Sequence, residues 1–146
     1  MLKFLSLSRY ASMINKLSSH YMVNKLKEYK INYTQFIILM ILYNNEANTQ
    51  EELRQIIFVD KAAIARAIKD LENKGYIKRI LYMEDKRSKK ILITRKGNEI
   101  KNVVISSAIE WDNYLIKNLS ENEKNKLNSQ LEEAFMEGKK LFESIK

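Results

Sequence analysis

The chain of 146 residues contains no cysteine and no proline, and it has only three glycines and one histidine. The absence of cysteine excludes disulfides, thiol redox sensing and thiolate metal sites within this polypeptide. One histidine, His20, cannot supply a His-rich metal site. The scarcity of helix breakers favours long helices. The longest apolar run, Phe36–Tyr43, is far too short to span a membrane, so we expect no membrane partner.

Few residue patterns suit catalysis. The sequence has no Gly-rich phosphate loop, a Cys–His pair is ruled out, and a Ser–His triad would have to use His20. Glu132 and Glu133 are adjacent in a predicted helix, so they point in different directions and indicate solvated surface. We therefore predict that the protein is not an enzyme and needs no cofactor. The N-terminal segment resembles the start of a helix more than a signal peptide, which predicts a cytoplasmic location.

The net charge of +8 is uneven along the chain. Residues 49–98 carry thirteen Lys and Arg against seven Asp and Glu, a net charge of +6. Residues 99–146 carry seven Lys against nine acids, a net charge of −2. A basic patch confined to one segment is typical of a binding surface, although surface lysines also simply solvate helices.

Hydrophobic periodicity predicts a mainly α protein with one small β-hairpin. Capping patterns mark several helix starts: Thr34, Thr49 with Glu52, Asp60, and Ser120 with Glu123. Phe36–Tyr43 fits a buried strand or a short buried helix, and the Thr34 cap favours the helix. We expect helices at about 5–27, 36–43, 51–57, 60–74, 95–118 and 121–144, and strands at 76–82 and 90–94.

Two of these helices, 49–57 and 60–74, meet across Phe58 and Val59, which is the spacing of a helix-turn-helix. Ala63, Ile64, Ala67, Ile68 and Leu71 can face inward on the second helix. Its outward positions would then hold Lys61, Ala62, Ala65, Arg66 and Lys69. Arg66 could donate to a guanine edge or a phosphate. An ordinary amphipathic core helix with surface lysines has the same periodicity.

The predicted turn between the two strands is strongly basic, with Asp85, Lys86, Arg87, Lys89 and Lys90. Such a turn is a poor core element, but it can reach along a DNA duplex. Asp85 could pair with Arg87 and direct its guanidinium toward a narrow minor groove. Basic turns also protect β edges from aggregation. The helix-turn-helix and the basic hairpin together favour nucleic-acid binding.

These segments resemble the winged-helix regulators of the multiple-antibiotic-resistance (MarR) type. That family carries a recognition helix, a Leu-Glu-x-x-Gly stop, an apolar-basic strand, an Asp-x-Arg wing and a Leu-Thr-x-x-Gly return. The corresponding segments here are Val59–Arg66, Leu71–Gly75, Tyr76–Arg79, Asp85–Arg87 and Ile93–Gly97. The resemblance covers the whole chain and is most specific at 60–97.

The resemblance implies a single domain, residues 1–146, with a winged helix-turn-helix core at 33–97 and dimerisation helices at 1–30 and 98–146. It implies a homodimeric, ligand-responsive repressor of transcription that binds double-stranded DNA at a pseudo-palindromic operator. Arg66 and Arg87 would contact DNA, and Asp85 would orient the wing. The candidate DNA contacts are Thr49, Gln50, Lys61, Ala62, Ala63, Ala65, Arg66, Lys69, Asp85, Lys86, Arg87 and Lys89.

One departure from the family concerns Ala62, Ala63 and Ala65, where members often have Ser or Thr. The missing hydroxyl groups predict weaker direct base reading and more reliance on phosphates, thymine methyls and DNA shape, which suits A/T-rich operators.

The terminal helices have more apolar face than a small winged core can cover, which favours a two-fold dimer over a monomeric bundle. Gly138 marks either a close helix crossing or a tolerated helix defect. The resemblance also implies a cavity for a small aromatic or amphipathic effector. Tyr10, His20, Tyr21 and Trp111 are candidate linings, although simple core packing is the better explanation for each of them individually.

The main alternative is a winged-helix module that binds protein instead of DNA, which the basic face argues against. A double-stranded RNA binder is the third reading, and it is disfavoured because a recognition helix fits poorly in the A-form major groove.

Overall fold

The computed structural model of the chain describes residues 7–81 and 89–145. These residues form helices and one two-stranded antiparallel sheet, which confirms the predicted fold class. The elements are α1 (Leu7–Lys25), η1 (Lys27–Tyr29), α2 (Tyr33–Tyr43), α3 (Gln50–Ile57), α4 (Lys61–Asn73), β1 (Ile77–Leu81), β2 (Lys89–Ile93), α5 (Arg95–Glu99), α6 (Lys101–Leu115) and α7 (Glu121–Ser144). The chain divides into two compact units, one ending at Trp111 and the other beginning at Asp112. None of the described helices is long and apolar enough to cross a membrane.

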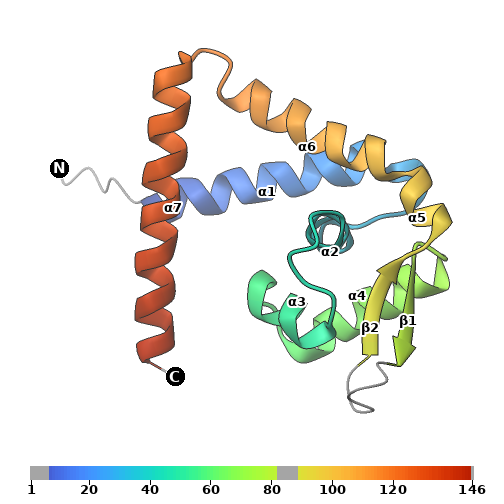
Figure 1. Cartoon of the computed structure of the whole chain (residues 1–146). Helices are drawn as coiled ribbons and strands as arrows, with labels where there is room; N and C mark the ends of the chain where they lie inside the picture. Colours follow the sequence, from blue (N-terminus) through green and yellow to red (C-terminus); the bar gives the residue numbers. More distant parts are fainter. Residues whose placement is uncertain (1–6, 82–88, 146) are drawn as a thin grey trace. The chain divides into compact units, whose positions relative to one another are not determined.

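The core of the first unit is built around α2, which buries seven of its eleven residues. A helix that is apolar on most sides must pack against several neighbours. Figure 1 shows α2 with α1 on one side and α3 and α4 on the other. Met22 of α1 and Ile64 and Leu71 of α4 join this core and are almost fully buried. The ambiguous run Phe36–Tyr43 is therefore a buried helix, as predicted.

Side chains begin three helices at the predicted positions: Thr49 with Glu52, Asp60 ahead of α4, and Ser120 with Glu123. The predicted stop at Gly75 is also confirmed, because this residue has φ +80°. Its N–H donates to the Glu72 carbonyl, and the N–H of Tyr76 donates to the Leu71 carbonyl. This pair of bonds is a Schellman motif, which turns the chain sharply out of α4 into β1.

The predicted cap at Thr34 is wrong. The side chain of Asn32 accepts a hydrogen bond from the N–H of Gln35 (2.9 Å), and the Gln35 side chain accepts one from the N–H of Asn32 (3.1 Å). This reciprocal pair satisfies two helix-end donors at once, so α2 begins at Tyr33 and Thr34 lies inside the first turn.

The predicted continuous helix at 95–118 is also wrong, because a break at Ile100 separates α5 from α6. The hydroxyl of Tyr43 donates to the carbonyl of Gly97 at 2.6 Å. In a continuous α-helix that carbonyl would serve the N–H of Lys101. The bond from Tyr43 and the burial of the Ile100 side chain both tie the chain to the core at the break.

The two strands pair from Ile77 with Ile93 at the base to Leu81 with Lys89 at the far end. The predicted turn is wrong at Lys89 and Lys90, which belong to β2 and pair with Leu81 and Ile80, and the rest of it lies outside the described residues. The loop ahead of α3 is joined to β2, since the N–H of Ile91 donates to the Asn48 carbonyl at 2.7 Å and Thr49 pairs with Lys90. The start of the helix-turn-helix is thereby fastened to the hairpin.

The two helices nearest the chain ends expose apolar side chains. On α1, Tyr10, Met13, Ile14 and Leu17 are all exposed. In the second unit, α7 buries no residue, and its exposed apolar residues are Leu131, Phe135, Met136, Leu141 and Phe142. Both helices therefore carry an apolar surface that their own unit leaves uncovered, as predicted.

Candidate nucleic-acid interface

Helices α3 and α4 are joined across Phe58 and Val59, as the sequence predicts, with Asp60 as the cap that precedes α4. Phe58 caps α3 in the left-handed conformation (φ 57°), and its N–H donates to the Arg54 carbonyl. Asp60 then accepts a hydrogen bond from the N–H of Ala63 at 2.8 Å and begins α4. The turn and the cap place the N-terminal end of α4 through bonds between neighbouring residues.

One face of α4 is buried, and the opposite face is basic and exposed. Ile64, Ala67, Ile68 and Leu71 are buried against the core. The exposed positions are Lys61, Ala62, Arg66, Lys69 and Asn73. Ala63 and Ala65 are half-buried, so each presents part of its surface. The four predicted contacts Lys61, Ala62, Arg66 and Lys69 therefore share one surface.

The cations on this face form no salt bridges with neighbouring acids, although the charge of Lys61 acts on Glu51. Lys61, Arg66 and Lys69 form no ion pair with any residue in 7–81 or 89–145. Arg54 on α3 differs, because its guanidinium forms two hydrogen bonds with the Glu51 carboxylate. Those bonds lower the pKa of Glu51 to about 2. The cations of α4 remain available to an anionic partner.

The predicted DNA contacts at the start of α3 also belong to the local structure that begins this helix. The Thr49 hydroxyl oxygen accepts the N–H of Glu52 at 3.3 Å, and Gln50 is the first residue of α3. Both residues are half-buried. The Thr49 hydroxyl can still donate a hydrogen bond to a phosphate oxygen while it accepts this one.

The hairpin contributes Lys89 to the site. It is exposed at the far end of β2, opposite Leu81. The other predicted wing residues, Asp85, Lys86 and Arg87, lie outside the described residues.

A salt bridge that sequence reasoning missed joins α4 to the hairpin. The Glu72 carboxylate accepts hydrogen bonds from the Arg79 guanidinium at 2.6 and 3.0 Å and from the Arg79 N–H at 3.2 Å. Arg79 holds the pKa of Glu72 below its ordinary value. The sequence offered one signal for this pair, the Glu of the Leu-Glu-x-x-Gly motif. Its partner, Arg79, could not be identified from the sequence because it lies on β1, beyond the turn at Gly75. The pair fixes the hairpin relative to α4.

Replacing Glu72 by Gln is expected to lower the free energy of unfolding at pH 7 by about 1 kcal/mol. The folded-state pKa of Glu72 is lowered, so its stabilisation is fully present above the ordinary value of 4.5 and is lost as the pH falls through the lower folded value. Urea unfolding of both proteins between pH 7 and pH 3 should show the gap closing in acid. A gap that stayed constant over this range would contradict the assignment.

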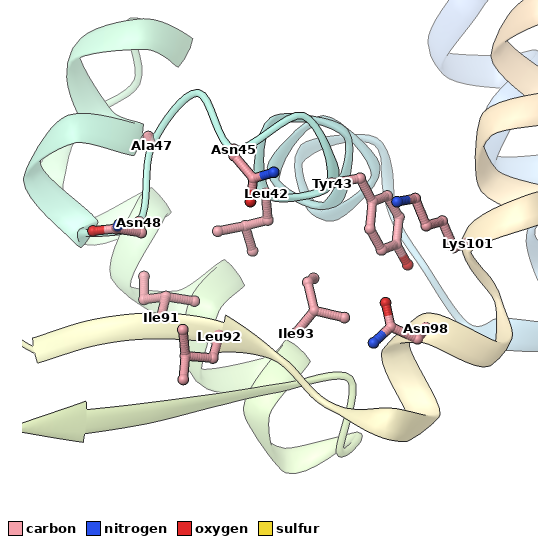
Figure 2. Close-up of a pocket in the computed structure, with 10 residues that line it drawn as sticks. All are labelled: Leu42, Tyr43, Asn45, Ala47, Asn48, Ile91, Leu92, Ile93, Asn98 and Lys101. Carbon is pink, nitrogen blue, oxygen red and sulfur yellow. The ribbon is translucent and has the colours of Figure 1, made fainter.

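A cavity of about 250 Å³ lies at the end of α2, between β2 and the start of α6. Figure 2 shows apolar side chains of Leu42 and Ile93 lining it beside the polar groups of Asn98 and Lys101. The Lys101 ammonium lies 5.5 Å from the centre of the Tyr43 ring. Burial raises the pKa of Tyr43 to about 12, so its hydroxyl stays protonated and keeps its bond to Gly97. The cavity combines an apolar wall with a cation.

The residues named from the sequence as effector linings do not line this cavity. Tyr10 and His20 are exposed on α1. Tyr21 and Trp111 pack against each other, with ring centres 5.1 Å apart. For that pair, core packing accounts for the contact.

Comparisons with known proteins agree with this geometry. Residues 31–89 match the MarR family model. Over 100 residues the chain is 33% identical to the HTH-type transcriptional regulator SarZ of Staphylococcus aureus, a match that covers 68% of this chain and 66% of that protein. The chain thus aligns with just under two thirds of this relative.

Solved structures resemble this chain over more of its length. A MarR transcriptional regulator from Methanosarcina mazei Go1 superposes with a TM-score of 0.85 and 28% identity, covering 92% of this chain and 97% of that one. A mutant MarR from E. coli, complexed with operator DNA, superposes with a TM-score of 0.76 and 25% identity, covering 90% and 95%.

Proposed function

Since this chain belongs to the MarR family, we propose that it is a transcriptional regulator that binds double-stranded DNA in a sequence-specific manner. The observation that carries the proposal is the exposed face of α4, where Lys61, Arg66 and Lys69 form no salt bridge with any described residue. A helix of this kind, presented by a helix-turn-helix, has the dimensions of the major groove.

On this proposal, Arg66 reads a guanine edge or a phosphate, and Lys61 and Lys69 bind phosphates. Ala62 is exposed and small, so the backbone of α4 can approach the bases and contact a thymine methyl. Arg87 is the proposed minor-groove contact and Asp85 its orienting partner, with Lys86, Lys89, Thr49 and Gln50 on the flanking backbone. Shape reading of this kind favours A/T-rich sites.

The regulator is proposed to act as a homodimer. One α4 contacts only a few base pairs, whereas two copies related by a two-fold axis read half-sites about 34–36 Å apart. The apolar surfaces of α1 and of α7 support this proposal, because soluble monomers rarely leave such surfaces uncovered. An isologous interface would cover both copies at once.

DNA selection with the purified protein at 100 mM salt tests the proposal. We expect an A/T-rich inverted repeat, whose affinity falls with salt by a slope of about −0.9 for each neutralised phosphate. Fluorescence anisotropy at several salt concentrations measures that slope. Failure to enrich any sequence, together with a flat salt response, would favour a protein-binding winged helix instead.

We also propose that the protein represses transcription by covering a promoter, and that a small effector releases it. The cavity beside Tyr43 and Lys101 supports this part, because it joins the winged core to the first turn of α6. An apolar wall with one cation suits a small amphipathic molecule that carries a negative charge. Screening small anions for release of the selected duplex tests this part, and release that persists in Lys101→Ala would place the effector elsewhere.

A further inference from the structure

The C-terminal end of α4 is fastened to the segment that connects α1 with α2. The Lys74 ammonium donates to the Lys30 carbonyl at 2.5 Å and to Gln35 Oε1 at 3.1 Å, and it forms an ion pair with Asp70 at 2.6 Å. An ammonium group has three donors, and these contacts use all of them. Lys74 is therefore occupied within the protein, in contrast to Lys69 one and a half turns earlier.

Gln35 is the buried centre of this arrangement, with an exposed fraction of 1%. Its Oε1 accepts hydrogen bonds from the N–H of Asn32 and from Lys74, and its Nε2 donates to Asp70. Both ends of the amide are thus satisfied. A buried amide whose oxygen and nitrogen both have partners favours one arrangement, because a shift of α4 against α2 would break these bonds.

A second bond attaches the turn after α4 to the same connection. The Tyr76 hydroxyl donates to the Tyr29 carbonyl at 3.2 Å, next to the carbonyl that Lys74 engages. Lys30 has a left-handed backbone (φ 55°) and ends η1. The two carbonyls therefore belong to a tight turn of fixed shape, which makes it a firm anchor for the end of α4.

Helix α4 has 13 residues and is about 20 Å long. If loss of this fastening let α4 tilt by about 10° about its capped N-terminal end, the C-terminal end would move by roughly 3 Å and Arg66, near the middle of the helix, by about 1 Å. Groups that read base edges must be held within about 0.5 Å of their productive geometry. A fastening at Lys74 would thus affect where Arg66 lies, although Lys74 is at the C-terminal end of α4.

We propose that Gln35 and Lys74 are positioning residues that set the tilt of the recognition helix α4 by fixing its C-terminal end to the α1–α2 connection. This inference rests on the proposed function, because a tilt matters only if α4 reads DNA. It assigns sequence specificity partly to residues that contact no DNA. Disturbing the connection between α1 and α2 should then change DNA reading without touching the basic face.

The test compares two duplexes of equal length, the one recovered by DNA selection and a scrambled version of it. Gln35→Met keeps the side-chain volume and removes the amide, and Lys74→Met removes the ammonium. We expect each variant to bind the selected duplex at least about tenfold more weakly, a loss comparable to that of a mismatched site. Binding to the scrambled duplex should change by less than about twofold for Gln35→Met, since phosphate attraction is independent of tilt.

The matched control is Lys69→Met, an exposed lysine of the same helix. It should weaken both duplexes alike and reduce the salt slope by about 0.9. Lys74→Met should leave the slope unchanged, because its ammonium is engaged internally. A reduced slope with equal loss on both duplexes would make Lys74 a phosphate contact and overturn the proposal.

Circular dichroism and urea unfolding establish that each variant is folded at the assay temperature. If Gln35→Met does not fold, Asp70→Asn takes its place in the test, because it removes the ion pair with Lys74 on the half-exposed side of this network. Selective loss of the selected duplex in that variant supports the proposal, and an unchanged ratio overturns it. If the wild-type protein binds neither duplex, the proposed function itself fails, and this inference fails with it.

Discussion

Replacing Arg66 by Ala is expected to weaken binding to the selected duplex by about 1–3 kcal/mol per half-site, which is roughly fivefold to 150-fold for each half-site. Arg66 is exposed on α4 and forms no ion pair with a described residue. Its loss removes a planar fork of donors from the face that meets DNA. The fold should persist, because the buried face of α4 is unchanged. Fluorescence anisotropy at fixed salt measures the affinity, and circular dichroism measures the helix content.

Arg95→Ala is the matched control for that experiment. Its guanidinium is 96% exposed and lies 3.6 Å from Glu99, at the base of the hairpin. The variant has the same net charge as Arg66→Ala, so a general effect of charge would weaken both equally. We expect a change of less than about threefold for Arg95→Ala. Equal losses in the two variants would refute the assignment of Arg66.

Replacing Gly97 by Ala is expected to destabilise the protein by about 3 kcal/mol. A Cβ at this position would lie 2.2 Å from the carbonyl oxygen of Tyr76 and 2.9 Å from Cγ2 of Ile93. The Tyr76 carbonyl cannot simply move, because it accepts the N–H of Thr94. The Gly97 carbonyl is also held, by the Tyr43 hydroxyl. Urea unfolding at pH 7 measures the loss, and a stability within 1 kcal/mol of wild type would contradict it.

Gly138→Ala provides the contrast within the same chain. A Cβ there meets nothing within 4 Å. Glycine in a helix costs about 0.5–1 kcal/mol relative to alanine, so this change should stabilise the protein by that amount. A loss of stability instead would indicate that a second chain approaches α7 at this residue, which the proposed homodimer allows.

Local signals in the sequence determined most of the secondary structure. Capping residues such as Thr49 and Asp60 act on donors two or three residues away, so their effect can be read directly from the chain. Gly75 likewise ends α4 through bonds within its own turn. The basic, exposed face of α4 follows from the spacing of four buried apolar residues. These predictions are confirmed because each depends on neighbours in the sequence.

The errors arose where one pattern competed with another or with a distant residue. Thr34 is a good cap in isolation, but Asn32 and Gln35 form a reciprocal pair that satisfies two donors. The break at Ile100 depends on Tyr43, which lies 54 residues from the carbonyl of Gly97. Helical periodicity cannot reveal a hydroxyl that arrives from another helix.

By itself, the sequence determined that this is a helical protein with a hairpin, a basic helix-turn-helix and uncovered apolar faces near its ends. Only the tertiary structure decided how α4 is held, with Glu72 joined to Arg79 on one side and Lys74 joined to Gln35 and Lys30 on the other. The physical reason is the distance along the chain over which each kind of interaction acts. Periodicity and capping act within a turn or two of helix, whereas a buried polar group takes whichever partner the folded chain brings to it.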